Sequence, residues 1–114
     1  MPKIITVLCT LVAAAVATNP TISYGGSFYN DCSSVSTSAS VYDGSCVNIE
    51  NFPLKSFSAY IASGTCPDGT SAVFSTYTAS GCDNSTLYEA VSVDSDKQCF
   101  EADVTLISLS AACV

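Results

Sequence analysis

The sequence predicts a small, mostly β domain, an antiparallel β-sandwich or barrel stabilised by disulfides. Three observations predict it: apolar residues alternate with polar ones over several segments, turn-forming residues separate these segments, and six cysteines follow an apolar leader. Strict period-two alternation is typical of strands with one buried face. Short strands at regular intervals fit a compact sandwich or barrel.

The clearest strand is expected at residues 99–109, where Phe100, Ala102 and Val104 alternate with Glu101 and Asp103. Further strands are expected at 57–61, 72–78 and 87–93. The stretch 83–93 also matches the spacing of one or two helical turns. The serine-rich stretch 33–40 is expected to be a loop or a weak edge strand. Turn signals separate these runs: Gly25-Gly26, Asp43-Gly44-Ser45, Pro67-Asp68-Gly69, Ser80-Gly81 and Asp94-Ser95-Asp96.

The first residues have the layout of a secretory signal. Lys3 gives a basic start, residues 4–16 are largely apolar, and Ala15-Val16-Ala17 supplies a small-residue cleavage site. The apolar run is shorter than the roughly 20 residues that a membrane span needs. We therefore expect residues 1–17 to be a signal peptide and residues 18–114 to be a single secreted, extracellular domain.

The cysteines beyond this leader are expected to form disulfides. In an exported chain an oxidising compartment makes pairing the expected state, but six cysteines can pair in many ways and the sequence does not choose among them. Zinc is disfavoured because the cysteines are widely spaced and the chain has no histidine. We predict no metal and no cofactor, and disulfides among Cys32, Cys46, Cys66, Cys82, Cys99 and Cys113.

The charge balance excludes several classes of partner. Without Lys3, two lysines stand against ten carboxylates. Nucleic acids and anionic membranes are bound by clusters of Lys and Arg, so neither is expected as a partner. Strong acidity helps to keep a secreted protein soluble, and we expect a monomer.

No catalytic set stands out. The absence of histidine excludes Ser-His-Asp and Cys-His arrangements. Two carboxylate pairs, Asp94 with Asp96 and Glu101 with Asp103, are the remaining option, since glycosidases hold two carboxylates roughly 5 to 9 Å apart. Solvated surface carboxylates explain both pairs more simply, so we predict no catalytic residue and a protein that is not an enzyme.

Two surface features are predicted near the expected strands. Tyr24, Phe28 and Tyr29 are aromatic residues flanked by glycine and could form a contact patch for a sugar or a protein. The favoured alternative is that they pack into the core or cover a sheet edge. Asn84-Ser85-Thr86 is an N-glycosylation acceptor, and Asn84 is the predicted glycan site.

The layout of an apolar leader followed by six spaced cysteines resembles that of fungal small secreted cysteine-rich proteins. The segments 64–70 (GTCPDGT) and 77–82 (YTASGC) carry the resemblance in detail. Many such proteins are candidate effectors of plant-associated fungi. The resemblance implies binding to a host protein or a cell-wall polysaccharide in the space between plant cells. A secreted protease or glycosidase inhibitor, or a small hydrolase, is the alternative.

Tyr77 and Cys82 also resemble the aromatic turn of βγ-crystallin-like domains, although those domains carry an aromatic residue at Cys82 and a glycine at Asn84. Residues 30–34 (NDCSS) have a loose similarity to their calcium loop, but Val35 stands where serine is expected. A faint internal repeat aligns residues 42–46 with residues 77–82, and Cys32 with Cys66.

Overall fold

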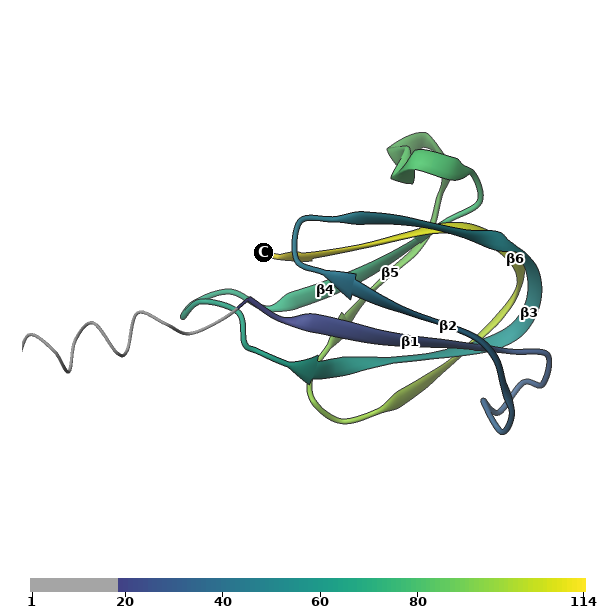
Figure 1. Cartoon of the computed structure of the whole chain (residues 1–114), viewed down its shortest axis with the longest axis horizontal. Helices are drawn as coiled ribbons and strands as arrows, with labels where there is room; N and C mark the ends of the chain where they lie inside the picture. The colour runs from purple at the N-terminus through teal and green to yellow at the C-terminus, as the bar shows by residue number, and fades with distance from the viewer. Residues whose placement is uncertain (1–18) are drawn as a thin grey trace, which may run out of the picture.

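The computed structural model describes residues 19–114, so the predicted signal peptide lies outside the described residues. The described chain forms an all-antiparallel sheet with two single-turn 3-10 helices (Figure 1), which confirms a mostly β, disulfide-stabilised fold. The elements are β1 (Thr21–Ser27), β2 (Val35–Tyr42), β3 (Cys46–Ser63), β4 (Ala72–Tyr77), η1 (Ser80–Cys82), η2 (Asn84–Thr86), β5 (Leu87–Val93) and β6 (Gln98–Cys113).

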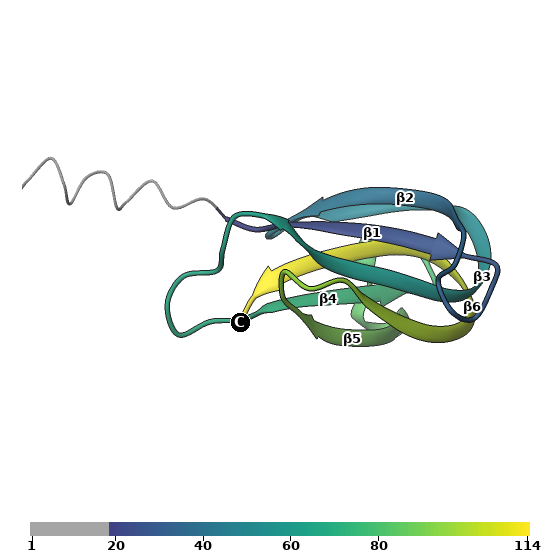
Figure 2. The same ribbon diagram turned by 90° about the horizontal axis from the view of Figure 1, so that it is seen from below.

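The strand order is β2-β1-β3-β6-β4-β5. The two central strands, β3 and β6, are 18 and 16 residues long, and both bend strongly along their length (Figure 1). The bend turns β1 and β2 over β4 and β5, and Figure 2 shows them as two layers. One continuous sheet therefore forms a sandwich with a core between its own two ends.

The sheet has an internal twofold pseudosymmetry centred on the pair of Pro53 in β3 and Thr105 in β6. On either side of this pair, Phe52 lies opposite Leu106 and Leu54 opposite Val104. An irregularity in the pairing follows in each direction, between Asn48 and Phe52 and between Leu54 and Ser56. The strand order is also the same from either edge. Residues 19–66 form the first half of this arrangement and residues 72–114 the second half.

Pairing with β3 and β6 relates the remaining strands of the two halves. Ser56 corresponds to Ser108, because Ser56 follows Pro53 along β3 by as many residues as Ser108 follows Thr105 along β6. Their partners Ser27 and Tyr77 therefore correspond, as do Tyr24 with Phe74 and Gly26 with Thr76 farther along β1 and β4. The repeat expected from the sequence used a wrong register, because the structure relates Cys32 to Cys82 and not to Cys66.

The core lies between the two layers. Tyr24, Phe57 and Phe74 form its aromatic centre, with ring centroids 5.9 to 6.2 Å apart. All three are at most 1% exposed. Aliphatic residues from every strand complete the cluster: Ile22, Val41, Leu54, Ala59, Ala72, Val93, Ala102, Leu106, Leu109 and Ala111.

The six predicted cysteines all pair, as Cys32–Cys99, Cys46–Cys82 and Cys66–Cys113. Every bridge joins the first half to the second, and the first two bridges occupy related places on the two sides of the pseudotwofold. The bridges close segments with sequence separations of 67, 36 and 47 residues. In the chain-entropy model each closure contributes about 4 kcal/mol.

Three local expectations are resolved by the structure. The prediction of a turn at Gly25-Gly26 is wrong, because both glycines lie inside β1. A Cβ at Gly26 would lie 2.6 Å from the Tyr24 hydroxyl oxygen, so glycine is needed there for space and not for a turn. The stretch 33–40 falls largely in the edge strand β2. In the stretch 83–93, a single 3-10 turn precedes strand β5.

Candidate binding site

The loop of residues 28–34 joins β1 to β2 and is fixed by a buried serine. The Ser56 hydroxyl, which is fully buried in β3, donates a hydrogen bond to the Tyr29 carbonyl and accepts one from the Cys32 N–H at 2.9 Å. Cys32 has a φ of 58°, in the left-handed region, and its disulfide to Cys99 ties the loop to β6. A loop held in this way presents its side chains on a rigid base.

Phe28 and Tyr29 project from the start of this loop into solvent. They are 51% and 60% exposed, and the Phe28 ring packs on Phe52 of β3 with a centroid separation of 4.5 Å. We call Phe28, Tyr29 and Phe52 the aromatic ledge. Tyr24 is not part of a contact patch: it is 1% exposed in the core, as the favoured alternative expected, because it shares the inward face of β1 with Ile22.

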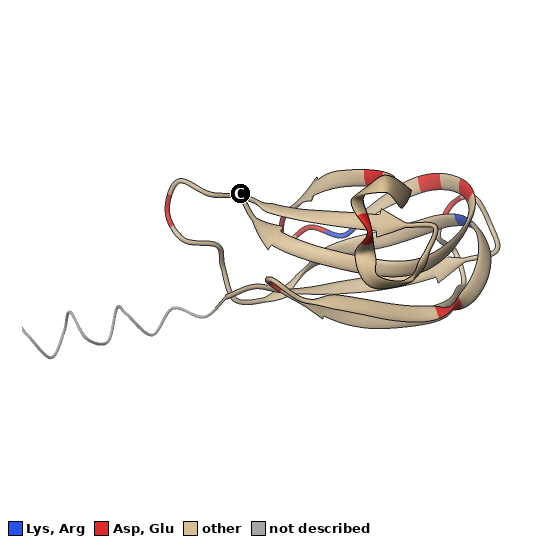
Figure 3. Ribbon diagram, turned by 90° about the horizontal axis from the view of Figure 1, so that it is seen from above, with Lys and Arg blue, Asp and Glu red and all other residues tan. Residues whose placement is uncertain are grey.

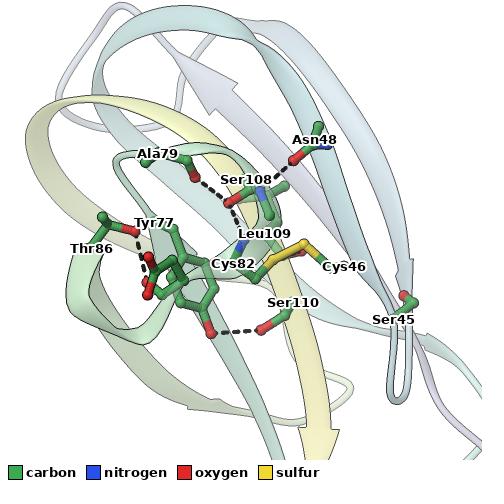
Figure 4. Close-up of a disulfide and its surroundings, with 12 residues drawn as sticks. Ser45, Cys46, Asn48, Tyr77, Ala79, Cys82, Thr86, Ser108, Leu109 and Ser110 are labelled. Carbon is green, nitrogen blue, oxygen red and sulfur yellow. Dashed lines mark hydrogen bonds between the residues drawn. A yellow bond between two sulfur atoms is a disulfide. The ribbon is translucent and has the colours of Figure 1, made fainter.

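The second half contains a loop built in the same way (Figure 4). The buried Ser108 hydroxyl donates to the Ala79 carbonyl at 2.6 Å and accepts from the Cys82 N–H at 3.0 Å. Cys82 has a φ of 54° and is bonded to Cys46. The Asn48 side chain adds a hydrogen bond from the Gly81 N–H at 2.9 Å. Apart from the Asn48 bond, the backbone of the two loops is thus held in the same way, by a buried serine and a bridged cysteine in the left-handed region.

The two loops differ in the residues that they expose. Where the first loop has Phe28 and Tyr29, the second has Thr78 and Ala79, and Val104 stands in the place of Phe52. The same backbone arrangement forms with small side chains, so the fold does not need the aromatic residues. Exposed aromatic side chains that the fold does not require are typical of contact sites.

Acidic residues dominate the charge around the molecule (Figure 3). Hydrogen bonds from the Ser33 hydroxyl and the Ser33 N–H lower the pKa of Asp31, which is exposed in the loop of residues 28–34, called the ledge loop below. A hollow of about 300 Å³ next to Phe52 is lined by Pro53, Leu54, Lys55, Asp103, Val104 and Thr105. Lys55 and Asp103 form an exposed ion pair of 3.1 Å across it, which is worth little to stability.

The candidate carboxylate pairs lie on the surface. Asp94 and Asp96 share a turn, in which the Asp96 N–H donates to the Asp94 carboxylate at 2.9 Å. Glu101 and Asp103 lie on the exposed face of β6, as predicted, and the Asp103 carboxylate forms an ion pair with Lys55. Among residues 19–114, no group of three or more His, Cys, Asp or Glu side chains is arranged to hold a metal ion.

Asn84 lies at the start of η2 with an exposed side chain. The turn is capped by Asp83, whose carboxylate accepts from the Ser85 N–H at 3.1 Å, and the Thr86 hydroxyl donates to the Asp83 carbonyl at 2.7 Å. The Asn84 position on the second loop is thus accessible to solvent.

Sequence reasoning missed Phe52. It lies between two irregularities in the pairing of β3 with β6, at residues 48–52 and 54–56. A bulge moves a side chain to a different face of the strand, which the alternation of the sequence does not reveal. The adjacent Pro53 is a sequence signal for such an irregularity.

The part of the chain that the structure describes has no helix of sufficient length and apolar character to cross a membrane. Comparison with protein-family models, with curated proteins and with solved structures gives no match for this chain.

Proposed function

We propose that this chain is a secreted binding protein that contacts a partner outside the cell through the aromatic ledge. The observation that carries the proposal is the difference between the two halves. Phe28 and Tyr29 are exposed on a loop whose counterpart is built with Thr78 and Ala79. Large exposed aromatic side chains on a rigid base lose little conformational entropy on binding, and such residues contribute strongly to interfaces.

An extracellular location is supported by the three disulfides and by the secretory layout of residues 1–17. The proposed setting is the apoplast of a plant host, following the resemblance to fungal secreted effector-like proteins. The partner is then a host protein or a wall polysaccharide. We also propose that Asn84 carries a glycan, which would cover the second loop and leave the first loop open.

The test is a pull-down with the folded, oxidised protein from plant apoplastic fluid and from polysaccharide slurries. The informative variant is Phe28→Thr combined with Tyr29→Ala, which gives the first loop the residues found at the related positions of the second loop. Leu87→Thr with Tyr88→Ala is the matched control, because these adjacent side chains are also exposed, at 47% and 41%, but lie away from the ledge on β5.

We expect the wild type and the control to retain the same partner and the ledge variant to lose it. Truncation of an aromatic anchor typically costs roughly 2 kcal/mol, or about 30-fold in affinity. Equal retention by all three proteins, or by none of them, would contradict a binding role for the ledge.

A further inference from the structure

Strand β2 is a sheet edge without the usual protection, and a bridge to β6 begins only after the strand, where Asp43 lies opposite Ala111. It lies at one end of the strand order and has the sequence VSTSASVY, with no charged residue and no proline. Proteins commonly protect such edges with lysine, proline or inward-pointing charges, because unpaired backbone groups recruit other strands. The edge strand of the second half, β5, contains Glu89 and is followed at once by Asp94.

The hydrogen-bonding pattern identifies the backbone groups that face outward. The Asp43 N–H donates to the Pro20 carbonyl at 3.3 Å, so these two residues form a hydrogen-bonded pair. In an antiparallel ladder such pairs alternate with pairs whose N–H and C=O groups point away. From the register of β1 with β2, the outward groups belong to Ser38 and Ser40, while those of Tyr42 are taken up by Ser45. Ser36 lies in the irregularity between Val35 and Thr37 and has no paired residue on β1. Ser38 and Ser40 are both exposed, and their side chains are small and neutral.

The position of β2 suits it to extend the contact made by the ledge. The loop that carries Phe28 and Tyr29 leads directly into Val35, the first residue of β2, which is itself 48% exposed. A segment paired with β2 would therefore begin or end beside the aromatic ledge. It would also lie between two carboxylates: Asp31 is exposed before the strand, and the half-buried Asp43 follows it, with its Oδ1 accepting the Cys113 N–H at 3.0 Å.

We propose that β2 accepts an extended segment of a partner protein as an additional strand, and that this segment carries Lys or Arg near its ends and no acidic residues. This inference rests on the proposed binding function and specifies that the partner is a protein and not a polysaccharide. Main-chain hydrogen bonds to the outward groups give affinity, while charge selects the segment. A paired strand of eight residues spans about 27 Å, enough to place basic residues near both carboxylates.

The probe is a synthetic peptide, acetyl-Lys-Thr-Val-Thr-Val-Thr-Val-Lys-amide, compared with the same peptide carrying Glu for Lys. Binding is followed by amide hydrogen exchange and by chemical shifts of the isotope-labelled protein. We expect the basic peptide to slow exchange at Ser38 and Ser40, and the acidic peptide to have no effect. No protection at millimolar basic peptide overturns the inference.

The decisive variant is Ser38→Pro. The Ser38 N–H points outward, so proline there removes an edge donor without breaking the ladder to β1. Ala90→Pro is the matched control, because Ala90 occupies the related outward position on β5. Ser38→Pro should weaken peptide binding about tenfold or more, and Ala90→Pro should not. Equal weakening by both prolines, or by neither, overturns the inference, and near-ultraviolet circular dichroism verifies that both variants fold.

Failure of this inference is distinguishable from failure of the proposed function. If the ledge variant loses its partner in the pull-down while Ser38→Pro retains it, the ledge is a binding site and β2 is not. Retention by a polysaccharide slurry with protection confined to residues 28–34 would assign the ledge to carbohydrate and also overturn the inference. A dimer of the free protein that Ser38→Pro dissociates would assign the edge to a second copy instead.

Discussion

The hydroxyl of Tyr24 fills the space that a side chain at Gly26 would need, since a Cβ there would lie 2.6 Å from the hydroxyl oxygen. This hydroxyl is buried and has no hydrogen-bond partner among the described residues. Burial also raises the pKa of the Tyr24 phenol, so the group stays neutral. In the second half Phe74 and Thr76 occupy the two related positions. Phe74 lacks the hydroxyl of Tyr24, and Thr76 has the Cβ that Gly26 lacks.

We predict that Tyr24→Phe stabilises the protein by about 1 kcal/mol, because it removes a buried polar group that has no partner. Gly26→Ala alone should destabilise it, and by less in the Tyr24→Phe background, where the contact with Thr37 Cγ2 at 2.7 Å remains. Urea unfolding of the two single variants and the double variant measures this coupling. Additive effects would show that the two residues do not compete for space.

The buried serines that hold the two loops should be equally important to stability. Ser56→Ala and Ser108→Ala each remove a hydroxyl that bonds a carbonyl and an N–H, and each leaves those backbone groups short of a partner. We expect each substitution to cost about 2 to 3 kcal/mol in the free energy of unfolding. Ser92→Ala on exposed β5 is the control and should change stability little. A large loss at only one of the two buried sites would contradict the structural equivalence of the loops.

Much of the fold is readable from the sequence because its signals are local. The alternation around Phe100 and Ala102 predicted the strand that became β6, and the exposed Glu101 and Asp103 follow from the same pattern. Gly25 and Gly26 were misinterpreted because their role depends on tertiary neighbours, namely the Tyr24 hydroxyl for Gly26 and the Ser58 and Val35 side chains for Gly25. The disulfide pairing could not be predicted either, because it depends on which distant cysteines the tertiary fold brings together.

The site was only half predictable. The alternation of Ile22 and Tyr24 with Thr21 and Ser23 is a strand pattern, and it agrees with the favoured expectation that Tyr24 packs into the core. The exposure of Phe28 and Tyr29 depends on the hydrogen bonds of Ser56, which lies on another strand. No local pattern contains that contact, and the correspondence with Thr78 and Ala79 emerges only from strand register.

The two related disulfides should make similar contributions to stability, with the larger one from Cys32–Cys99, which closes the longer loop. Removing Cys32–Cys99 or Cys46–Cys82 by paired serine substitution should each cost about 4 kcal/mol in the chain-entropy model, with the longer loop costing about 0.5 kcal/mol more. Reduction of all three bridges should then unfold the domain. Denaturant midpoints of the two variants measure the difference. A variant that kept the wild-type midpoint would show that its bridge does not constrain the unfolded chain.

The contribution of Asp31 in the ledge loop to stability should depend on pH. Its lowered pKa means that the folded state favours the carboxylate, so this contribution is present above the unfolded-state pKa of about 3.9 and is lost as the pH falls through the lower folded-state pKa. Ser33→Ala removes the hydroxyl bond, the largest cause, and should move the pKa of Asp31 back toward its ordinary value. The Ser33 N–H bond at 3.0 Å remains and should keep part of the shift. Carboxyl chemical shifts against pH measure it, with Ser34→Ala as the control, and an unchanged titration of Asp31 in Ser33→Ala would refute the assignment.

Asn84 should carry an N-linked glycan when the chain is made in a eukaryotic secretory pathway. Its side chain is exposed on η2 and is followed by Ser85 and Thr86, the acceptor pattern. Asn19 is followed by a proline, which excludes it as an acceptor. Intact mass before and after enzymatic removal of N-glycans should reveal one glycan, absent from Asn84→Gln and retained in Thr86→Ser. Because the glycan would stand on the second loop, its removal should leave partner retention by the aromatic ledge unchanged. Loss of retention in Asn84→Gln would place the contact on the glycosylated loop instead.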